Sequence, residues 1–258
     1  MKFARFEYKG KVFLGMVKGG EITVLDGSLF DRYEETKAHY PLSDVKLLPP
    51  ALPTKIVCIG RNYRGHIEEI GAEVPEEPEV FLKPPSSLIG HEDAIIYPRN
   101  AQRVDYEGEL AVVIKDKMKD VPEDETLNHV LGCSCFNDVT ERALVMKDPS
   151  LLIVAKGFDT FSPFGPYIVT GLNPNNLEVK TYLNGKLMQH DNTKNWVFSI
   201  QQILHYASQC MTLYPGDILT TGTPKGTAPM KPDDVVEVEI EGIGKLRNMV
   251  KAAEATPS

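Results

Sequence analysis

Long apolar runs are absent from this sequence. None of its apolar stretches approaches the ~20 residues that a membrane-spanning helix needs. The first residues, MKFARFEYKGKVF, have the alternation of a β-strand and lack the apolar centre of a secretion signal. We therefore expect neither a membrane span nor a signal peptide.

Cysteine is also scarce. The four cysteines, Cys58, Cys133, Cys135 and Cys210, have neither the spacing of a disulfide framework nor that of a zinc site. Cys133 and Cys135 lie in the apolar run VLGCSCF, so two small buried residues are a better interpretation than a redox pair. This cysteine usage predicts a reducing, cytoplasmic environment.

An excess of positive charge is missing as well. The chain has 28 lysines and arginines against 36 acidic residues, a formal net charge of −8. This balance argues against nucleic-acid binding, which needs a basic face. A small anionic substrate is still compatible with it, because local cations decide such binding. The 258 residues, 42% of them hydrophobic, are enough to bury a sizeable core.

The pattern of the chain is β-rich, with two regions. Residues 1–50 contain short alternating segments separated by glycines and predict a small N-terminal β domain, with a helix or loop near Leu29–Tyr40. The proline-rich segment 49–53 predicts a stiff linker, so we expect a second domain over residues 54–258. This part is mostly strand-like but includes an amphipathic helix, Ser199–Cys210, which makes the fold class β-rich α+β.

In the segment Val104–Lys115, VDYEGELAVVIK, two glutamates alternate with Tyr106, Gly108 and Leu110. In a strand, Glu107 and Glu109 face the same side, about 7 Å apart, next to an apolar continuation. Like charges directed together into a half-buried place repel each other unless a cation lies between them. Asp138, which follows an apolar segment, is a candidate third acid. Three such carboxylates would suit Mg²⁺.

Simpler interpretations of these acids stay open. The segment VEVEIEG at residues 236–242 has the same alternation and is typical of a half-exposed strand with an acidic face. Glu107 and Glu109 could form a face of that kind. Asp138 could serve only as the cap of a helix over Val139–Met146.

A candidate general base lies near the start of the larger region. His66 and Glu69 are three residues apart in GHIEEIG, so they can touch on a helical turn. A carboxylate on an imidazole raises its basicity and fixes its tautomer. An incidental surface pair is the alternative. The acidic, proline-rich segment 72–79 that follows predicts a mobile lid hinge.

Two lysines and a turn complete the polar candidates. Lys83 ends a strand-like segment and Lys156 follows an apolar one; each could meet an anionic substrate, although exposure to solvent is the default expectation. The turn TGTPKG, which includes Thr223, could offer N–H and hydroxyl donors to a developing oxyanion, or it could be only a turn.

Taken in order, these segments resemble the fumarylacetoacetate hydrolase family. The resemblance covers residues 55–250, and the first 50 residues resemble the small appended domain of bacterial members. The matching stretches are GRNYRGHIEEIG, the Lys83-Pro84 strand, Glu107-x-Glu109, the run from Asn137 to Arg142, Ala155-Lys156 and TGTPKGTAPMKPDD.

The resemblance implies a mixed β-roll catalytic domain, a homodimer, and Mg²⁺ or Mn²⁺ held by Glu107, Glu109 and Asp138. It also implies roles for six other residues: His66 and Glu69 match a catalytic dyad on a lid, Lys156 a lysine near the oxyanion, Lys83 and Arg142 polar groups around the substrate, and Thr223 a substrate-binding threonine.

The same resemblance suggests the reaction. We expect a metal-dependent hydrolase that cleaves a C–C bond in an acylpyruvate-type 2,4-dioxo acid, such as fumarylpyruvate or acetylpyruvate, through an enolate. Family hydrolases typically read Asp-x-Thr-x-Arg-Asp-x-Gln in the third motif, whereas this chain has Ala143 and Val145 at the last two named positions. The missing glutamine helps hold substrate or the attacking water. Decarboxylation of an oxaloacetate-type acid, isomerisation of 2-hydroxyhepta-2,4-diene-1,7-dioate and non-catalytic binding of metal and oxo acid are therefore alternatives.

Overall fold

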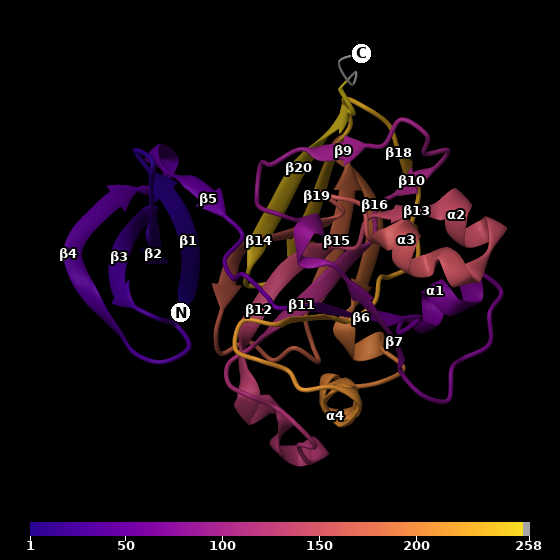
Figure 1. The fold of residues 1–258 in the computed structure, drawn as a ribbon, viewed down its shortest axis with the longest axis horizontal. Coiled ribbons are helices and arrows are strands. Elements are labelled where there is room, and N and C mark those ends of the chain that lie inside the picture. The colour runs from indigo at the N-terminus through magenta and orange to yellow at the C-terminus, as the bar shows by residue number, and fades with distance from the viewer. Residues whose placement is uncertain (255–258) are drawn as a thin grey trace.

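The N-terminal region is an antiparallel meander that joins the largest sheet of the molecule. The computed structural model describes residues 1–254. The first strands are β1 (Lys2–Tyr8), β2 (Lys11–Lys18), β3 (Glu21–Gly27), β4 (Tyr33–Pro41) and β5 (Lys46–Leu48). They enclose a small core of their own, formed by Ala4, Phe6, Ile22, Val24 and Leu47. On this ground we propose that residues 1–50 are a domain, the indigo lobe at the left of Figure 1.

The expectation of a helix or loop near Leu29–Tyr40 is wrong, because β4 occupies most of that segment. β4 lies at the end of the sheet and pairs only with β3 along the strand order. Most of its residues are exposed, so its sequence, YEETKAHYP, lacks the apolar alternation that identifies a strand with one buried face. Its charged residues are typical of an edge strand.

The same sheet continues into the larger region. Beyond β1 its order is β14 (Ser162–Val169), β12 (Val130–Asn137), β11 (Gly108–Ile114), β17 (Ile218–Thr220), β6 (Ile56–Gly60) and β7 (Glu79–Lys83). Neighbours in this part are antiparallel except β17 and β6, which are parallel. A short strand, β8 (Leu88–Ile89), pairs with β14. β11 is buried along its whole length, as its apolar run requires.

Two smaller sheets pack beside it. One contains β16 (Lys186–Asn192), β15 (Glu178–Leu183), β19 (Val235–Ile240), β20 (Gly244–Ala252) and β9 (Ile95–Tyr97); the other contains β13 (Thr140–Glu141), β10 (Val104–Asp105) and β18 (Pro229–Met230). The main core lies between β11 and β12 on one side and β15, β19 and β20 on the other. The acids of β19 are half-exposed, as their alternation predicts.

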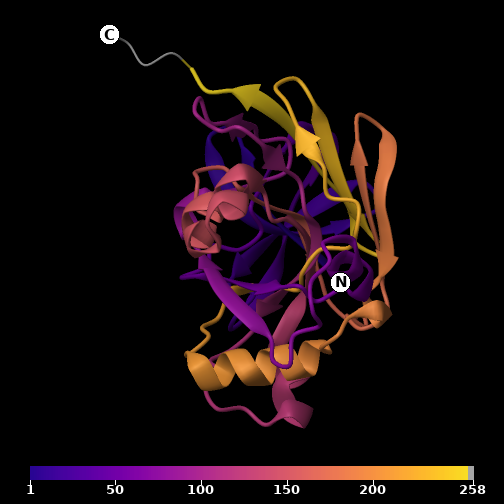
Figure 2. The ribbon, with the colours of Figure 1, turned by 90° about the vertical axis from the view of Figure 1, so that its right-hand side faces the viewer.

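Helices are few and short in the described part of the chain. They are α1 (Arg64–Glu69), α2 (Arg142–Lys147), α3 (Leu152–Lys156) and α4 (Ile200–Cys210), with 3₁₀ turns at Leu42–Asp44, Pro85–Ser87, Glu123–His129, Pro149–Leu151 and Thr193–Asn195. α4 begins at the capping box of Ser199 and Gln202 and buries its predicted apolar face below the sheets (Figure 2). None of these helices is long and apolar enough to cross a membrane.

The pairing of β11 with β12 sets the position of the acidic residues. Gly108 lies opposite Asn137, so the acids on either side of Gly108 and the one after Asn137 emerge at the same end of the sheet. The N–H of Asp138 donates to the carbonyl of Glu107 at 2.8 Å, which continues the contact beyond the ladder. Residues 31 positions apart in sequence are thereby brought side by side.

The buried carboxylate of Asp217 accepts hydrogen bonds from the first residues of the larger region. Asp217 Oδ1 accepts from the Thr54 N–H at 2.9 Å, the Thr54 hydroxyl at 2.7 Å and the Lys55 N–H at 3.1 Å. Its Oδ2 accepts from the Tyr214 N–H at 2.8 Å and pairs with the Lys55 ammonium. Asp217 therefore ties the segment after the proline-rich stretch to β17.

We predict that Asp217→Asn lowers the free energy of unfolding by about 2–4 kcal/mol, because an amide nitrogen would face donors that now have an acceptor. Urea unfolding measures the change. Asp31→Asn, at an exposed position, is the matched control and should change stability by less than about 0.5 kcal/mol. A loss below about 1 kcal/mol for Asp217→Asn would contradict this account of the contact.

Candidate metal centre and active site

Three buried carboxylates meet at the end of β11. Glu107, Glu109 and Asp138 each offer an oxygen, and these oxygens all lie within 4.8 Å of one another. All three residues are at most 5% exposed. The structure thus brings together the acids that the sequence singled out. Asp138 does not cap a helix, because the side chain at the N-terminus of α2 is that of Glu141, which accepts from the Leu144 N–H.

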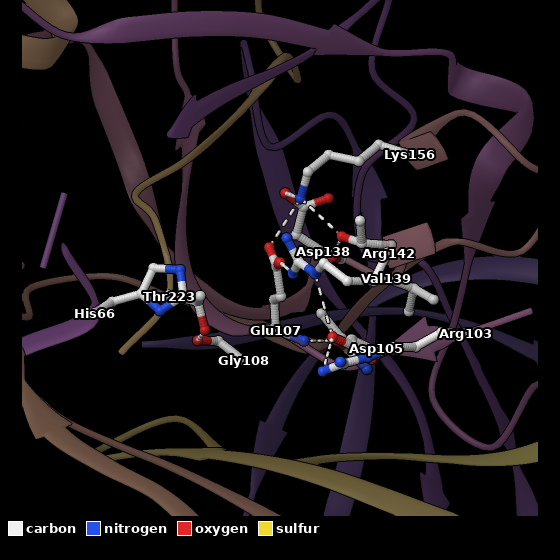
Figure 3. A network of polar contacts seen from close by, with 12 residues as sticks. His66, Arg103, Asp105, Glu107, Gly108, Asp138, Val139, Arg142, Lys156 and Thr223 are labelled. Carbon is white, nitrogen blue, oxygen red and sulfur yellow. Dashed lines mark hydrogen bonds and ion pairs between the residues drawn. The ribbon is translucent and has the colours of Figure 1, made fainter. Parts of the chain in front are cut away.

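Two lysines donate hydrogen bonds to different carboxylate oxygens of Asp138. Lys156, at the end of α3, donates to Asp138 Oδ2 at 2.5 Å, Glu107 Oε2 at 2.8 Å and the Thr140 hydroxyl at 2.9 Å (Figure 3). Lys83, at the end of β7, donates to Asp138 Oδ1 at 2.6 Å and to the carbonyls of Val139 and Phe161. Both lysines are buried, so the expectation of exposure is wrong for both.

An arginine and an aspartate form the next layer of contacts. Arg142, the first residue of α2, donates to Asp105 Oδ2 at 3.2 Å and pairs with Glu107 Oε1. Asp105 is fully buried and also accepts two hydrogen bonds from Arg103, at 2.9 and 3.0 Å. Figure 3 shows this chain of contacts below Glu107. Sequence reasoning missed Asp105, although it precedes Glu107 by two residues and continues the same alternation.

The three acids differ in how their charges are balanced. Burial would raise the pKa of Glu107, but Lys156 and Arg142 outweigh it and lower this pKa to about 2. Burial raises the pKa of Glu109 well above its usual range, and Asp138 and Glu107 add to the effect. Glu109 receives the Gly222 N–H at 2.8 Å, whereas the ammonium groups of both lysines bond to its neighbours. Among the three acids, Glu109 is therefore the one that accepts no hydrogen bond from a lysine or arginine in the described contacts.

The predicted dyad is assembled on α1. His66 Nδ1 lies 3.1 Å from Glu69 Oε2, and the Gly226 N–H donates to both oxygens of Glu69 at 3.0 and 3.1 Å. With Nδ1 bonded to the carboxylate, Nε2 is the nitrogen that can exchange a proton. Asn62, just before α1, donates to the Thr221 carbonyl at 3.0 Å and accepts from the Phe198 N–H. The start of this helix is thus anchored to the loop that contains Thr223.

Thr223 contacts the backbone between the two glutamates. Its hydroxyl donates to the Gly108 carbonyl at 3.0 Å and accepts from Gln189 Nε2 at 2.8 Å. Gln189 also accepts from the Gly108 N–H at 3.0 Å. A Cβ at Gly108 would lie 2.0 Å from the Thr181 hydroxyl, so only glycine fits between the two acids. Sequence reasoning missed Gln189, which no local pattern distinguishes.

One cavity of about 410 Å³ contains the reactive groups. Its walls include the three acids together with His66, Arg142, Lys156 and Thr223. Among the described residues that line it, Glu69 and Lys83 are not found: Glu69 lies behind the imidazole, and Lys83 lies behind Asp138. The assignment of Lys83 to substrate stays a prediction, and its contacts here are with Asp138 and two carbonyls.

The two unusual residues of the third motif lie in different places. Val145 lines the 410 Å³ cavity, where it adds an apolar wall. Ala143 lines a separate cavity of about 1120 Å³, together with Arg99 and Phe158. Of the two differences, the one at Val145 is therefore the one next to the candidate chemistry.

We predict that Mg²⁺ or Mn²⁺ stabilises this protein and that Glu109→Gln removes the effect. A ligand that binds only the folded state adds about 2.7 kcal/mol to the free energy of unfolding at 100 times its Kd. Thermal unfolding with and without each ion measures the difference. Glu237→Gln, on the half-exposed acidic face of β19, is the control and should keep the full stabilisation. Equal stabilisation of both variants would rule out the three-acid site.

Comparisons with known proteins agree with this geometry. The family model named Fumarylacetoacetate (FAA) hydrolase C-terminal matches residues 55–251, and the model Rv2993c-like, N-terminal, matches residues 1–50. An uncharacterized protein of Archaeoglobus fulgidus is 48% identical over 95% of this chain and 94% of its own length. Oxaloacetate tautomerase Fahd2a of Rattus norvegicus, a mitochondrial protein, is 38% identical over 81% of this chain and 71% of its own.

Solved structures of similar proteins have the same fold as this chain. A 2-hydroxyhepta-2,4-diene-1,7-dioate isomerase from Mycobacterium marinum is 36% identical, with a TM-score of 0.92 over 99% of this chain and 100% of that one. A maleylpyruvate hydrolase from Sphingobium sp. SYK-6, in complex with manganese(II) and pyruvate, is 29% identical, with a TM-score of 0.83 over 98% and 100%. With a family match that spans most of its length and relatives that align over nearly all of it, this chain belongs to the fumarylacetoacetate hydrolase family.

Proposed function

We propose that the protein is a divalent-metal-dependent enzyme that moves a proton at the carbon next to the keto group of a short 2-oxo acid, as in keto–enol tautomerisation of an oxaloacetate-type diacid. The observation that supports this best is the presence of His66, backed by Glu69, in the same 410 Å³ cavity as the three acids. A cavity of this size is near the lower end for small-molecule sites, roughly 300–1,000 Å³, and suits a short substrate.

The residues present fit a hard divalent cation. Three carboxylates give an all-oxygen donor set, which suits Mg²⁺ or Mn²⁺. Burial beside Asp138 and Glu107 raises the pKa of Glu109, and a bound divalent cation would offset the repulsion among these carboxylates. Glu107, Glu109 and Asp138 would hold the ion, which would act as a Lewis acid on the 2-oxo group of the substrate.

The side chains divide the remaining work. His66 Nε2 takes the proton as the C–H bond next to the keto group breaks, the C–H electron pair forms the C=C bond, and the C=O π pair moves onto the oxygen. The imidazolium then returns the proton to that oxygen, which completes the enol. Glu69 keeps the imidazole in the required tautomer. Burial alone would lower the pKa of Lys156, but Asp138 and Glu107 outweigh it and raise this pKa. Lys156 therefore stays charged and stabilises the negative charge that develops on the oxygen.

The apolar wall at Val145 favours proton transfer over hydrolysis. The resemblance assigns this position to a glutamine that holds substrate or attacking water in family hydrolases, and a valine has no group to bind water. The relative from rat that is named an oxaloacetate tautomerase and the isomerase from M. marinum agree with this choice. Decarboxylation of an oxaloacetate-type acid also passes through an enolate, which forms as CO₂ leaves, and needs no positioned water.

Hydrolysis of an acylpyruvate is the second candidate. The observation that favours it is the dyad itself, because an imidazole held by a carboxylate can also activate water. The maleylpyruvate hydrolase with bound manganese and pyruvate has a closely similar fold, which supports this candidate as well. A protein that only binds metal and oxo acid would have no use for the dyad.

We also propose a homodimer in the cytoplasm. The outer face of α2 and α3 exposes three large apolar side chains, Met146, Ile153 and Val154, at 73%, 61% and 55%. A second copy of the chain on this face would cover them, as expected for an apolar patch on a soluble surface. All four cysteines are free thiols, which supports a reducing compartment.

The reaction is tested by offering four acids separately with Mg²⁺: enol oxaloacetate, keto oxaloacetate, acetylpyruvate and fumarylpyruvate. We expect fast decay of the enol absorbance of oxaloacetate, without release of CO₂. Pyruvate released from acetylpyruvate or fumarylpyruvate at a higher kcat/KM would favour hydrolysis instead, and CO₂ from oxaloacetate would favour decarboxylation. Metal binding without turnover of any acid would leave the non-catalytic alternative.

We predict that His66→Ala lowers kcat by about 10²–10⁴-fold, the usual contribution of a general base, and leaves the affinity for Mg²⁺ unchanged. Steady-state kinetics and a calorimetric Mg²⁺ titration give the two quantities. His190→Ala, on the exposed part of β16, serves as the control and should change neither. If the variant at His66 loses metal affinity in proportion to activity, the role given to the imidazole is wrong.

A further inference from the structure

A second arginine lines the cavity and has no role in the chemistry above. Arg61 comes directly after β6, and Glu79 is the first residue of β7, where it lies opposite Gly60. Arg61 Nε donates to Glu79 Oε2 at 2.6 Å, and a second guanidinium nitrogen pairs with the other carboxylate oxygen. Both residues line the cavity that contains the three acids. The pair is therefore a part of the substrate space.

The backbone at Arg61 adopts an uncommon conformation. Its φ is +43°, in the left-handed region that residues with a Cβ rarely occupy. Strain of this kind persists where the surrounding contacts enforce it, and it is concentrated at functional sites. Here Asn62, the next residue, is fully buried and bonded to the Thr221 carbonyl and the Phe198 N–H. The fold thus holds Arg61 at the cavity wall at some energetic cost.

Arg61 also differs from the other cations of the cavity. Lys156 and Arg142 are bonded to carboxylates that are almost fully buried. The side chain of Arg61 is 36% exposed and that of its partner Glu79 is 40% exposed. An ion pair this exposed contributes only about 0–1 kcal/mol, so another carboxylate can replace Glu79 at little cost. The guanidinium fork binds a carboxylate through two parallel hydrogen bonds.

We infer that Arg61 is a specificity-determining residue that binds the second carboxylate of a 2-oxo diacid, and that Glu79 is the resident group which this carboxylate displaces. The inference rests on the proposed function, which assigns the 2-oxo acid end of the substrate to the three acids. It adds that dicarboxylates are preferred over monocarboxylates and names the two side chains that set the preference.

The test compares two ligands that differ by a single carboxylate. Calorimetric titrations of the Mg²⁺-loaded protein with 2-oxoglutarate and 2-oxobutanoate give the Kd of each. We expect Arg61→Gln to raise the Kd for 2-oxoglutarate at least tenfold and the Kd for 2-oxobutanoate less than twofold. Arg61→Lys should have an intermediate effect. In turnover, Arg61→Gln should raise the KM for oxaloacetate and leave kcat within twofold.

Two further variants keep the test decisive. Glu79→Gln removes the competitor, so 2-oxoglutarate should bind two- to fivefold more tightly while 2-oxobutanoate is unchanged. This result stands even if Arg61→Gln unfolds, which its melting temperature reveals. Arg64→Gln, an exposed residue of α1, removes the same charge away from the cavity wall and should change neither Kd.

The possible failures are distinct. The inference is overturned if Arg61→Gln or Glu79→Gln changes the affinity for both acids equally, or for neither. The ion pair would then have only a structural role, as a contact between β6 and β7. If the wild-type protein loaded with Mg²⁺ neither binds nor turns over any 2-oxo acid, the proposed function itself fails, and the role of Arg61 fails with it.

Discussion

The balance of charge around three buried carboxylates is the constraint on which this site depends. Three buried acids close together repel one another, and each is costly to bury without a partner. The fold meets this requirement by directing Lys156 and Arg142 at Glu107, and Lys156 and Lys83 at Asp138. Glu109 alone receives no ammonium or guanidinium group among the described contacts. A divalent cation at these acids, as proposed above, would complete the balance.

This arrangement explains where α2 and α3 lie. α2 and α3 are short, and the residue at one end of each supplies a cation to the acids: Arg142 begins α2 and Lys156 ends α3. The third cation, Lys83, ends β7. α2, α3 and the more distant β7 are therefore attached to the same pair of carboxylates. Loss of one cation would loosen a segment as well as change a charge.

Sequence alone predicted the parts of the site that depend on local pattern. The two-residue spacing of Glu107 and Glu109 indicated a shared face, and the three-residue spacing of His66 and Glu69 indicated contact on a helical turn; both are as observed. Asp138 was a candidate third acid because it follows an apolar segment, and the pairing of β11 and β12 brings it to the same end of the sheet. The β-rich class followed from strand alternation.

The remaining features depend on contacts between distant residues. Nothing in the neighbourhood of Lys83 or Lys156 indicates burial, because the reason for it is Asp138, 55 and 18 residues away. Asp105 and Gln189 act through Arg142 and Gly108, which no single segment reveals. β4 was missed because an exposed edge strand needs no apolar face. In each case the deciding neighbour lies on another element.

The contact between Glu69 and Gly226 links the orientation of His66 to the position of α1. The carboxylate that orients His66 is held by a backbone N–H from the loop across the cavity, not by its own helix. A displacement of α1 relative to this loop would break that contact and remove the backbone hydrogen bonds that fix Glu69 behind His66. In the proposed reaction, proton transfer at Nε2 of His66 would therefore depend on the position of α1.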